Sequence, residues 1–211
     1  MEKIGIFGGT FNPIHLGHTN FCGECQRRFQ FDRLLLIPTN LPPHKAAPEL
    51  ASNEDRLNIV RLAARKLPGA EASDLEYRLG GRSYTVRTLE FLRQEYPQAQ
   101  LCLLIGSDML RSFRQWKDFE RILGLAQLIA GARMREEYDE LLSVRDGYGE
   151  LARRITVAQL PVREISSTQI RELLRTGGDV TGLLDPLVYA YIRERGLYGC
   201  GGSGEEHEKE R

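Results

Sequence analysis

The chain contains four short runs that are almost continuously apolar, and a fifth that is weaker. The four lie at residues 3–7, 34–38, 101–106 and 128–132, and the weaker run lies at 155–160. Runs of this length without polar alternation are typical of strands that are covered on both faces. We therefore expect a parallel sheet with helices packed on each side.

Segments with helical periodicity alternate with these runs. They span residues 16–29, 54–66, 84–95 and 119–123, and Ser52 with Asp55 forms a capping pair ahead of the second segment. Alternation of strand and helix implies right-handed crossovers. The predicted fold class is α/β, a Rossmann-like open parallel sheet with helices on both faces.

A small helical part is expected at the C-terminal end. A serine-rich turn at residues 165–168 opens a helix that Gly177 and Gly178 close, and a last helix follows Asp185-Pro186. The sequence after it, GCGGSGEEHEKER, is glycine-rich and then charged. We expect one domain over residues 1–198 and a disordered tail over residues 199–211.

Composition narrows the possible partners. Lys plus Arg and Asp plus Glu both number 29 among the 211 residues, so the net charge gives no field that would hold a nucleic-acid backbone. No apolar run approaches the roughly 18 residues of a membrane span, and the N-terminal sequence has too short an apolar core for a secretory signal. We expect a cytoplasmic protein that binds neither nucleic acid nor membranes.

The four cysteines include one C-x-x-C pair, Cys22 and Cys25, and no second pair that would complete a zinc site. Both lie on the same helical stripe as Phe21 and Phe29. We interpret them as buried packing residues rather than as metal ligands or a redox pair.

The first predicted strand is followed by the sequence GGTFNPIHLGH, residues 8–18. In an open parallel sheet this strand-to-helix turn lies outside the carboxyl ends of the strands, where ligands bind. Gly8 and Gly9 would let the backbone approach a ligand closely, and the free N–H groups of the next helix favour phosphate. The stretch is neither a G-x-G-x-x-G dinucleotide fingerprint nor a Walker A loop, since no Gly-Lys-Ser/Thr follows.

Two histidines, His15 and His18, lie one helical turn apart, with Gly17 between them leaving room for a bulky group. At this spacing both imidazoles reach one point. Zinc is the competing interpretation, but the spacing is not H-E-x-x-H and no third ligand is evident nearby in the sequence. We interpret the pair as donors to oxygens that gain charge during phosphoryl or nucleotidyl transfer.

Five blocks of sequence, running in order, resemble one enzyme family. HLGH resembles the H-x-G-H signature of the nucleotidyltransferase superfamily, and ISSTQIR resembles its second signature, with Ser166 followed by Arg171. The blocks IPTNLPPHK, SYTVRTL and IGSDMLRSFRQWKDFERIL narrow the match. Together they resemble the bacterial nicotinate-nucleotide adenylyltransferases from residue 3 to about residue 198, so the resemblance implies a single nucleotidyltransferase domain over residues 1–198.

This resemblance implies that ATP and nicotinate mononucleotide react to give deamido-NAD (nicotinate adenine dinucleotide) and pyrophosphate in NAD biosynthesis. The mononucleotide phosphate would attack the ATP α-phosphorus in line, with Mg²⁺ carried by the ATP phosphates and no metal ligand from protein side chains. The implied catalytic residues are His15, His18 and Arg171. The implied ATP-binding residues are Gly8, Gly9, Thr10, Phe11, His15, His18, Gly106, Asp108, Ser166, Ser167, Thr168 and Arg171.

The same resemblance implies an acceptor site. Lys45 would contact the mononucleotide phosphate, Trp116 would stack on the pyridine ring, and Tyr84 and Thr85 would hold the nicotinate carboxylate, largely through backbone N–H groups. Two positions depart from the family pattern. Asn12 stands where many members have aspartate, and we expect its role to be architectural. Lys117 stands where another aromatic is common, which leaves the preference for acid over amide open.

Two other functions fit parts of the sequence. One is a transferase of the same fold that acts on nicotinamide mononucleotide, phosphopantetheine or a phosphorylated alcohol. A phosphopantetheine enzyme, however, usually has threonine in place of His15. The other is a non-catalytic nucleotide sensor. Sensors tend to lose charged transition-state groups, whereas both histidines and Arg171 are present here.

Overall fold

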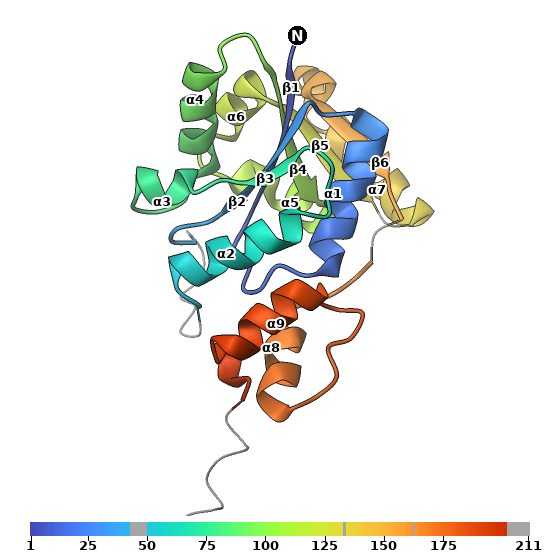
Figure 1. The fold of residues 1–211 in the computed structure, drawn as a ribbon. Helices are drawn as coiled ribbons and strands as arrows, with labels where there is room; N and C mark the ends of the chain where they lie inside the picture. The colour runs from blue at the N-terminus through green and yellow to red at the C-terminus, as the bar shows by residue number, and fades with distance from the viewer. Residues whose placement is uncertain (43–49, 133, 162, 202–211) are drawn as a thin grey trace, which may run out of the picture.

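A six-stranded, all-parallel sheet forms the centre of the computed structural model, which describes residues 1–42, 50–132, 134–161 and 163–201. Its strand order is β3-β2-β1-β4-β5-β6 (Figure 1). The strands are β1 (Lys3–Gly9), β2 (Arg33–Pro38), β3 (Ala70–Ala72), β4 (Gln100–Gly106), β5 (Gln127–Ala132) and β6 (Ile155–Gln159). The chain turns back across the sheet between β1 and β4, so a crevice for ligands is expected at the carboxyl ends of these two strands.

The register shows where the first strand ends. β1 pairs with β2 from Ile4↔Arg33 to Gly9↔Pro38, and with β4 up to Ile6↔Leu103. The strand therefore extends two residues beyond the predicted end, and Gly8 and Gly9 belong to the strand rather than to the turn.

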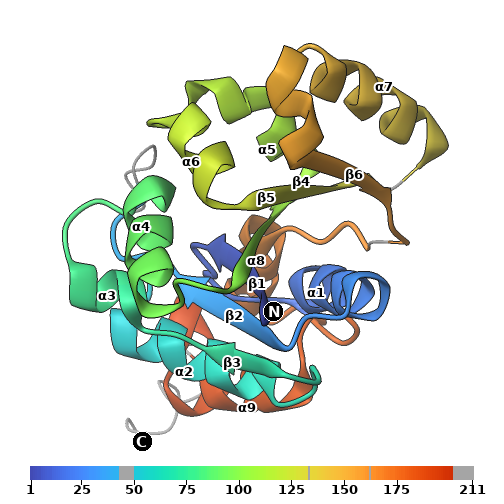
Figure 2. The ribbon, with the colours of Figure 1, turned by 90° about the horizontal axis from the view of Figure 1, so that it is seen from above.

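Helices cover both faces of the sheet, as predicted (Figure 2). On one face lie α1 (Leu16–Phe29) and α2 (Asn53–Ala64). On the other lie α3 (Leu75–Leu79), α4 (Thr85–Glu95), α5 (Ser107–Ser112), α6 (Phe119–Leu125) and α7 (Arg135–Asp146). Successive strand residues enter opposite apolar clusters: Leu34 and Leu36 pack toward α1 and α2, whereas Leu35 and Ile37 pack toward α4. This two-sided burial explains why the strands lack polar alternation.

Some elements were not predicted from the sequence: β3, α3, α5, α7 and the 3₁₀ helices of the described residues. Two have too few residues to show a period, since β3 has 3 residues and α3 has 5. In α7, Leu141 is the one buried residue, and Tyr138 and Leu142 pack beside it, so the apolar stripe of this 12-residue helix is narrow.

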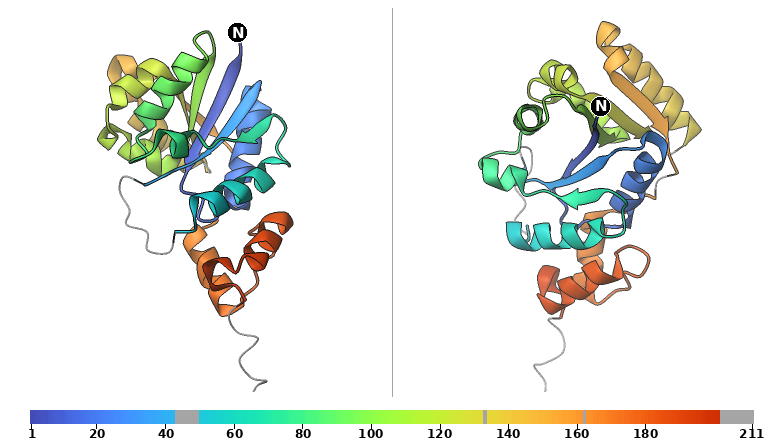
Figure 3. Two further views of the ribbon diagram at one scale, coloured as in Figure 1. Left: turned by 60° about the vertical axis from the view of Figure 1, so that its left-hand side comes forward. Right: turned by 45° about the horizontal axis from the view of Figure 1, so that its top comes forward.

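The helical part at the C-terminal end lies beyond the carboxyl edge of the sheet (Figures 1 and 3). It consists of α8 (Ser167–Thr176), α9 (Pro186–Glu194) and a short 3₁₀ helix at Leu197–Gly199. Gly177 ends α8 in the left-handed conformation, as predicted. The Asp55 carboxylate of α2 accepts hydrogen bonds from Tyr191 (2.9 Å) and Arg195 (3.2 Å), which fixes α9 against the main body. Residues 202–211 lie outside the described part, so the expected disorder of the tail remains a prediction, as does the domain boundary at residue 198.

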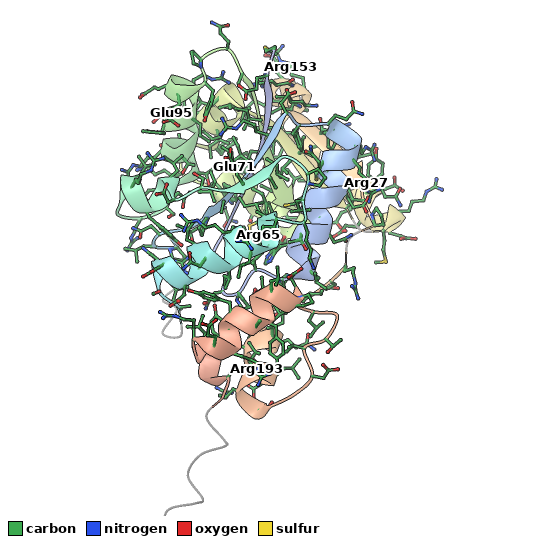
Figure 4. The ribbon with its side chains drawn as sticks, in the orientation of Figure 1. Arg27, Arg65, Glu71, Glu95, Arg153 and Arg193 are labelled. Carbon is green, nitrogen blue, oxygen red and sulfur yellow. The ribbon has the colours of Figure 1, made fainter. Side chains whose placement is uncertain are left out.

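Surface and buried groups agree with the composition. Acidic and basic side chains are distributed over many elements, and those labelled in Figure 4 come from α1, the end of α2, β3, α4, the 3₁₀ helix at Gly149–Arg154 and α9. In the described ranges no helix combines the length and hydropathy of a membrane span.

Cys22 and Cys25 are buried free thiols, and burial raises the pKa of Cys25 to about 12. Both lie in the buried apolar cluster that α1 and α2 form on their face of the sheet, as expected for packing residues.

Candidate active site

Two adjoining cavities open at the carboxyl edge of the sheet. The first cavity has a volume of about 740 Å³ and lies between the ends of β1, β4 and β5 and the start of α8. The second cavity, about 460 Å³, lies between β1, β2, α4 and the segment that carries Trp116. They share a wall formed by Gly8, Gly9, Thr10, Leu104, Ile105, Met109 and Trp116. Two ligands bound side by side would therefore meet across the end of β1.

The predicted residues divide between these two cavities. All twelve residues assigned to ATP line the first cavity: Gly8, Gly9, Thr10, Phe11, His15, His18, Gly106, Asp108, Ser166, Ser167, Thr168 and Arg171. Tyr84, Thr85 and Trp116 line the second cavity. Lys45 lies outside the described residues. Segments that are far apart in the sequence thus converge as the resemblance implied, while the role of each residue remains a prediction.

The turn after β1 is shaped by an aromatic residue in the left-handed region. Phe11 has φ 48° and is 2% exposed, and its ring meets the His18 ring edge-on at a centroid distance of 5.3 Å. A Cβ on Gly9 would lie 2.7 Å from the Phe11 ring, so Gly9 makes room for that ring. A Cβ on Gly8 would have its nearest neighbour 3.9 Å away. Of the two glycines, Gly8 is therefore the one that leaves open space.

The two histidines form a reciprocal cap at the start of α1. The backbone N–H of His18 donates to Nδ1 of His15, and the backbone N–H of His15 donates to Nδ1 of His18, each over 3.3 Å. Their rings stack with a centroid distance of 3.6 Å and an interplanar angle of 17°. Because both Nδ1 atoms accept hydrogen bonds, the proton of each neutral ring is on Nε2. The pair thus presents two fixed N–H donors at one point of the first cavity.

Burial keeps both imidazoles neutral in the free protein. It lowers the pKa of His15 to about 4, and it lowers the pKa of His18 well below the usual 6.5, with a further decrease from the neighbouring His15. Neutral rings stack without charge repulsion. They also retain the Nε2 protons that a phosphate oxygen accepts.

These lowered pKa values predict a pH-dependent stability. The unfolded chain binds protons at its histidines below about pH 6.5, whereas native His15 resists protonation until about pH 4. The stabilisation is therefore fully present above pH 6.5, and it is lost as the pH falls toward 4. His15 alone corresponds to about 3 kcal/mol over that range. We expect the free energy of unfolding, measured with urea, to fall more steeply between pH 6.5 and 4 in wild type than in His15→Asn. Asparagine keeps a capping acceptor but does not titrate. Parallel curves for the two proteins would contradict the lowered pKa.

Gly17 lies between the two histidines in a confined position. A Cβ at this residue would lie 2.9 Å from the carbonyl oxygen of Arg163 and 3.1 Å from Nδ1 of His15. Gly17 also lines the first cavity. The glycine was expected to leave room for a bulky ligand group, but the protein's own packing already requires it.

The start of α8 closes the first cavity. The Ser166 hydroxyl is the N-cap and accepts from the Gln169 N–H (3.5 Å), while the Ser167 hydroxyl donates to the Pro13 carbonyl (2.9 Å). These two hydroxyls fix the position of α8, so the backbone N–H groups of its first turn are the donors that face a ligand. Ser166 and Ser167 were predicted as donors to ATP, and the structure shows a capping and docking use for their hydroxyls.

Arg171 projects from α8 to the turn after β1. Its Nη1 donates to the Asn12 carbonyl (2.9 Å) and its Nη2 to the Thr168 hydroxyl (3.4 Å). Asn12 itself is buried, and its side-chain oxygen accepts from the backbone N–H of Ala51 (3.1 Å). The side chain of Asn12 thus holds a loop in place, which agrees with the architectural role expected for it.

The second cavity combines a helix start with aromatic rings. α4 begins at Thr85 without a side-chain cap, and the N–H of Tyr84 donates to the Arg82 carbonyl (3.0 Å). The N–H groups at the start of α4 that have no partner within the helix therefore begin with Thr85 rather than Tyr84. Nζ of Lys117 lies 4.6 Å from the centre of the Tyr84 ring and adds a positive charge to this cavity.

Sequence reasoning missed several cavity residues. Ser107, Met109 and Arg163 line the first cavity, and Thr39, Glu76 and Ser83 line the second. Glu76 is a buried carboxyl whose pKa is raised by burial, and it accepts a hydrogen bond from the Thr88 hydroxyl (2.8 Å). No local pattern distinguishes Glu76 from the charged residues Arg78 and Arg82 that follow it.

The side chains that line the first cavity indicate how a metal ion would be held there. Within the described ranges, no group of three or more His, Cys, Asp or Glu is arranged to hold one. The acidic residues lining the first cavity there are Asp108 and Glu164, among N–H, hydroxyl and guanidinium donors. This lining suits an anionic ligand that brings its own divalent cation.

Comparisons with known proteins agree with this geometry. Residues 6–173 match the family model described as cytidylyltransferase-like. A probable nicotinate-nucleotide adenylyltransferase from Desulfatibacillum aliphaticivorans is 38% identical, with 93% of this chain and 99% of the relative covered. Another, from Syntrophotalea carbinolica, is 37% identical and covers 93% and 97%.

Solved structures show the same fold. Plasmodium falciparum nicotinic acid mononucleotide adenylyltransferase, complexed with NaAD, matches with a TM-score of 0.79 at 19% identity over 95% of this chain and 98% of that one. A putative nicotinate-nucleotide adenylyltransferase from Vibrio parahaemolyticus matches with a TM-score of 0.64 at 26% identity, covering 94% and 96%. Both matches confirm the predicted fold class. The chain belongs to the nicotinate-nucleotide adenylyltransferase family of cytidylyltransferase-like proteins.

Proposed function

We propose that this protein transfers the adenylyl group of ATP to nicotinate mononucleotide, giving nicotinate adenine dinucleotide and pyrophosphate in NAD biosynthesis. Relatives 37–38% identical over nearly the whole chain carry this activity in their names. One phosphate oxygen of the mononucleotide forms a bond to the ATP α-phosphorus. The bond from that phosphorus to the oxygen bridging to the β-phosphorus breaks, and pyrophosphate leaves with this oxygen.

The observation that carries the proposal is the shared wall between the two cavities. One cavity presents histidine, guanidinium and helix N–H donors, which suit a triphosphate. The other presents Trp116, the start of α4 and Lys117, which suit a flat ring with a carboxylate. Because the cavities meet at Gly8–Thr10, a phosphate bound in the second cavity would lie beside the α-phosphate bound in the first. A reaction that joins two nucleotides needs this arrangement.

The protein's contribution would be positioning and charge stabilisation. In this proposal the Nε2–H groups of His15 and His18 donate to the ATP phosphates, with His18 serving the α-phosphate as its charge increases. Arg171, together with the first-turn N–H groups of α8, holds the departing pyrophosphate. Gly106 and Asp108, at the end of β4, approach the ATP ribose. Thr10 and Phe11 line the ATP site.

The acceptor would be held in the second cavity. Trp116 stacks on its pyridine ring, the Thr85 N–H group binds its carboxylate, and Lys117 attracts that carboxylate electrostatically. Lys45 contacts its phosphate in this proposal, on the resemblance alone.

The proposed reaction also needs a divalent cation. Mg²⁺ would enter with the ATP phosphates and neutralise charge on the leaving pyrophosphate. The first cavity's lining of donors with few carboxylates supports this route. We also propose that the protein acts in the cytoplasm.

Pyrophosphate release tests the proposed function. Purified protein is incubated with ATP and Mg²⁺ and, in separate reactions, with nicotinate mononucleotide, nicotinamide mononucleotide or phosphopantetheine as acceptor. We expect rapid release with the acid and slow release with the amide, because Thr85 N–H and Lys117 favour a negative charge.

Three other results would each change the proposal. Faster release with the amide would keep the reaction but overturn the assignment of the carboxylate site. Release with phosphopantetheine alone would overturn the acceptor altogether. If no acceptor leads to pyrophosphate release while calorimetry still shows ATP binding, the protein is a nucleotide sensor.

A further inference from the structure

Arg56 is a charged side chain at the centre of the protein. It lies in the first half of α2 and is 0% exposed. Its guanidinium lies over the Tyr77 ring, 5.4 Å from the ring centre. Burial lowers the pKa of Arg56. Removing a guanidinium from water is costly unless each N–H group finds an acceptor, so the bonds it makes are informative.

All five N–H groups of Arg56 are accounted for by oxygen acceptors. Nε donates to the Ala51 carbonyl (3.2 Å), and Nη2 donates to the side-chain oxygen of Asn53 (2.6 Å) and the Asn40 carbonyl (3.3 Å). Nη1 donates to the carbonyls of Thr10 (2.9 Å) and Thr39 (2.6 Å). One planar fork therefore holds carbonyl groups from three separate segments, which lysine with a single ammonium group cannot reproduce.

The acceptors of Arg56 belong to the walls of both cavities. Thr10 lines both the first and the second cavity, and Thr39 lines the second. These two residues follow the adjacent strands β1 and β2, and the Thr39 N–H also donates to the Gly9 carbonyl (2.9 Å). Nη1 of Arg56 thus ties together the chain segments that leave the two strands.

Hydrogen bonds extend this connection to the acceptor end of the second cavity. The Asn40 N–H donates to the Ser83 hydroxyl (2.8 Å), and the Asn40 side-chain amide donates to the Gly81 carbonyl (2.9 Å). Ser83 in turn interacts with the buried carboxyl of Glu76. The turn that precedes Tyr84 and Thr85 is therefore linked to the turn after β1 through Asn40 and Arg56.

We propose that Arg56 is a positioning residue that sets the spacing between the two cavities, so that the groups bound in each meet at reacting distance. The inference rests on the proposed function, since it concerns a reaction between two bound nucleotides. Arg56 is absent from the lining of both cavities. It acts through the carbonyl groups of Thr10, Thr39 and Asn40. A shift of about 1 Å between two reacting groups lowers a rate by on the order of 100-fold.

The test compares Arg56→Lys with a matched variant, Arg93→Lys. Arg93 also donates to backbone carbonyls, those of Ala99 (2.8 Å) and Leu125 (2.8 Å), but these precede β4 and β5 at the opposite edge of the sheet. Both variants keep the charge, and both lose the guanidinium fork. We expect both to unfold at a lower temperature than wild type. We expect only Arg56→Lys to lose kcat, by about 10- to 100-fold, with ATP affinity in calorimetry changed less than threefold.

A milder variant covers the case in which Arg56→Lys does not fold. Asn53 is exposed, and Asn53→Ala removes one acceptor of Arg56 together with the donor to the Asn40 side chain. We expect this variant to fold and to lose kcat by about twofold to fivefold, again with ATP affinity retained.

The outcomes separate this inference from the proposed function. If wild type turns over and Arg56→Lys loses no more kcat than Arg93→Lys, Arg56 is merely structural and the inference is overturned. A loss of ATP affinity that accounts for the whole loss of turnover also overturns it. If Arg56→Lys does not fold, wild-type kcat in Asn53→Ala overturns it as well. If the wild-type protein releases no pyrophosphate with any acceptor, the proposed function is overturned, and the inference with it.

Discussion

His18→Ala is expected to lower kcat by 100- to 1,000-fold, the loss that follows removal of a single positioned donor in other enzymes. The His18 ring is held by its stack on His15, by the edge of Phe11 and by the bond from the His15 N–H to its Nδ1. A ring held in this way needs no reorganisation as charge develops on the α-phosphate. Steady-state kinetics with saturating ATP and nicotinate mononucleotide would measure the effect.

Two further variants separate the ring's two nitrogens. In His18→Asn the side-chain oxygen can replace Nδ1 as acceptor of the His15 N–H, while the donor at Nε2 is lost. In His18→Gln the longer side chain can place an N–H₂ group near the former Nε2. We expect His18→Asn to be nearly as slow as His18→Ala, and His18→Gln to regain part of the rate. A wild-type rate in His18→Asn would show that His18 acts only through the helix cap.

The fold could be predicted from the sequence because its strands are buried on both faces. The run LLLIP alternates between the two apolar clusters without a polar residue, and the same holds in β4. Caps set several of the helix ends: Ser52 accepts from the Asp55 N–H at the start of α2, as predicted. Elements with few buried residues could not be found in this way, and α7, with Leu141 as its one buried residue, is an example.

The candidate site could be predicted where residues of unusual type stand together. His15 and His18 are three positions apart, so their proximity is a property of the helix. Arg171 lines the same cavity from α8, where it donates to the Asn12 carbonyl, more than 150 residues away in the sequence. The family resemblance, not the local pattern, predicted it.

Some positioning residues had no sequence pattern of their own. Arg56 resembles any surface arginine of an amphipathic helix until its five acceptors are known. Its partners are mostly backbone carbonyls, which every residue has. Glu76 is similar, since its hydrogen-bond partners Ser83, Thr88 and the Asn40 backbone come from other segments. A side chain that bonds to backbone groups cannot be recognised from the sequence, because its partners can be residues of any type.

Arg171→Ala is expected to lower kcat/KM for ATP by about 10- to 100-fold. A hydrogen bond to a charged group contributes about 1.5–3 kcal/mol, which corresponds to a loss in this range. The guanidinium is already oriented by the Asn12 carbonyl and the Thr168 hydroxyl, so little entropy is lost when a pyrophosphate group binds. In the reverse reaction, the KM for pyrophosphate should rise by a similar factor.

Arg175→Ala is the matched control for Arg171→Ala. Arg175 lies one turn further along α8, forms an ion pair with Glu172 and is absent from the lining of the first cavity. Its removal changes the net charge by the same amount. We therefore expect kcat/KM for ATP to change less than threefold in Arg175→Ala. Equal losses in the two variants would mean that the general field of α8 binds the phosphates. A loss confined to Arg171→Ala would assign the pyrophosphate contact to that guanidinium, because Arg171 lines the first cavity and Arg175 does not.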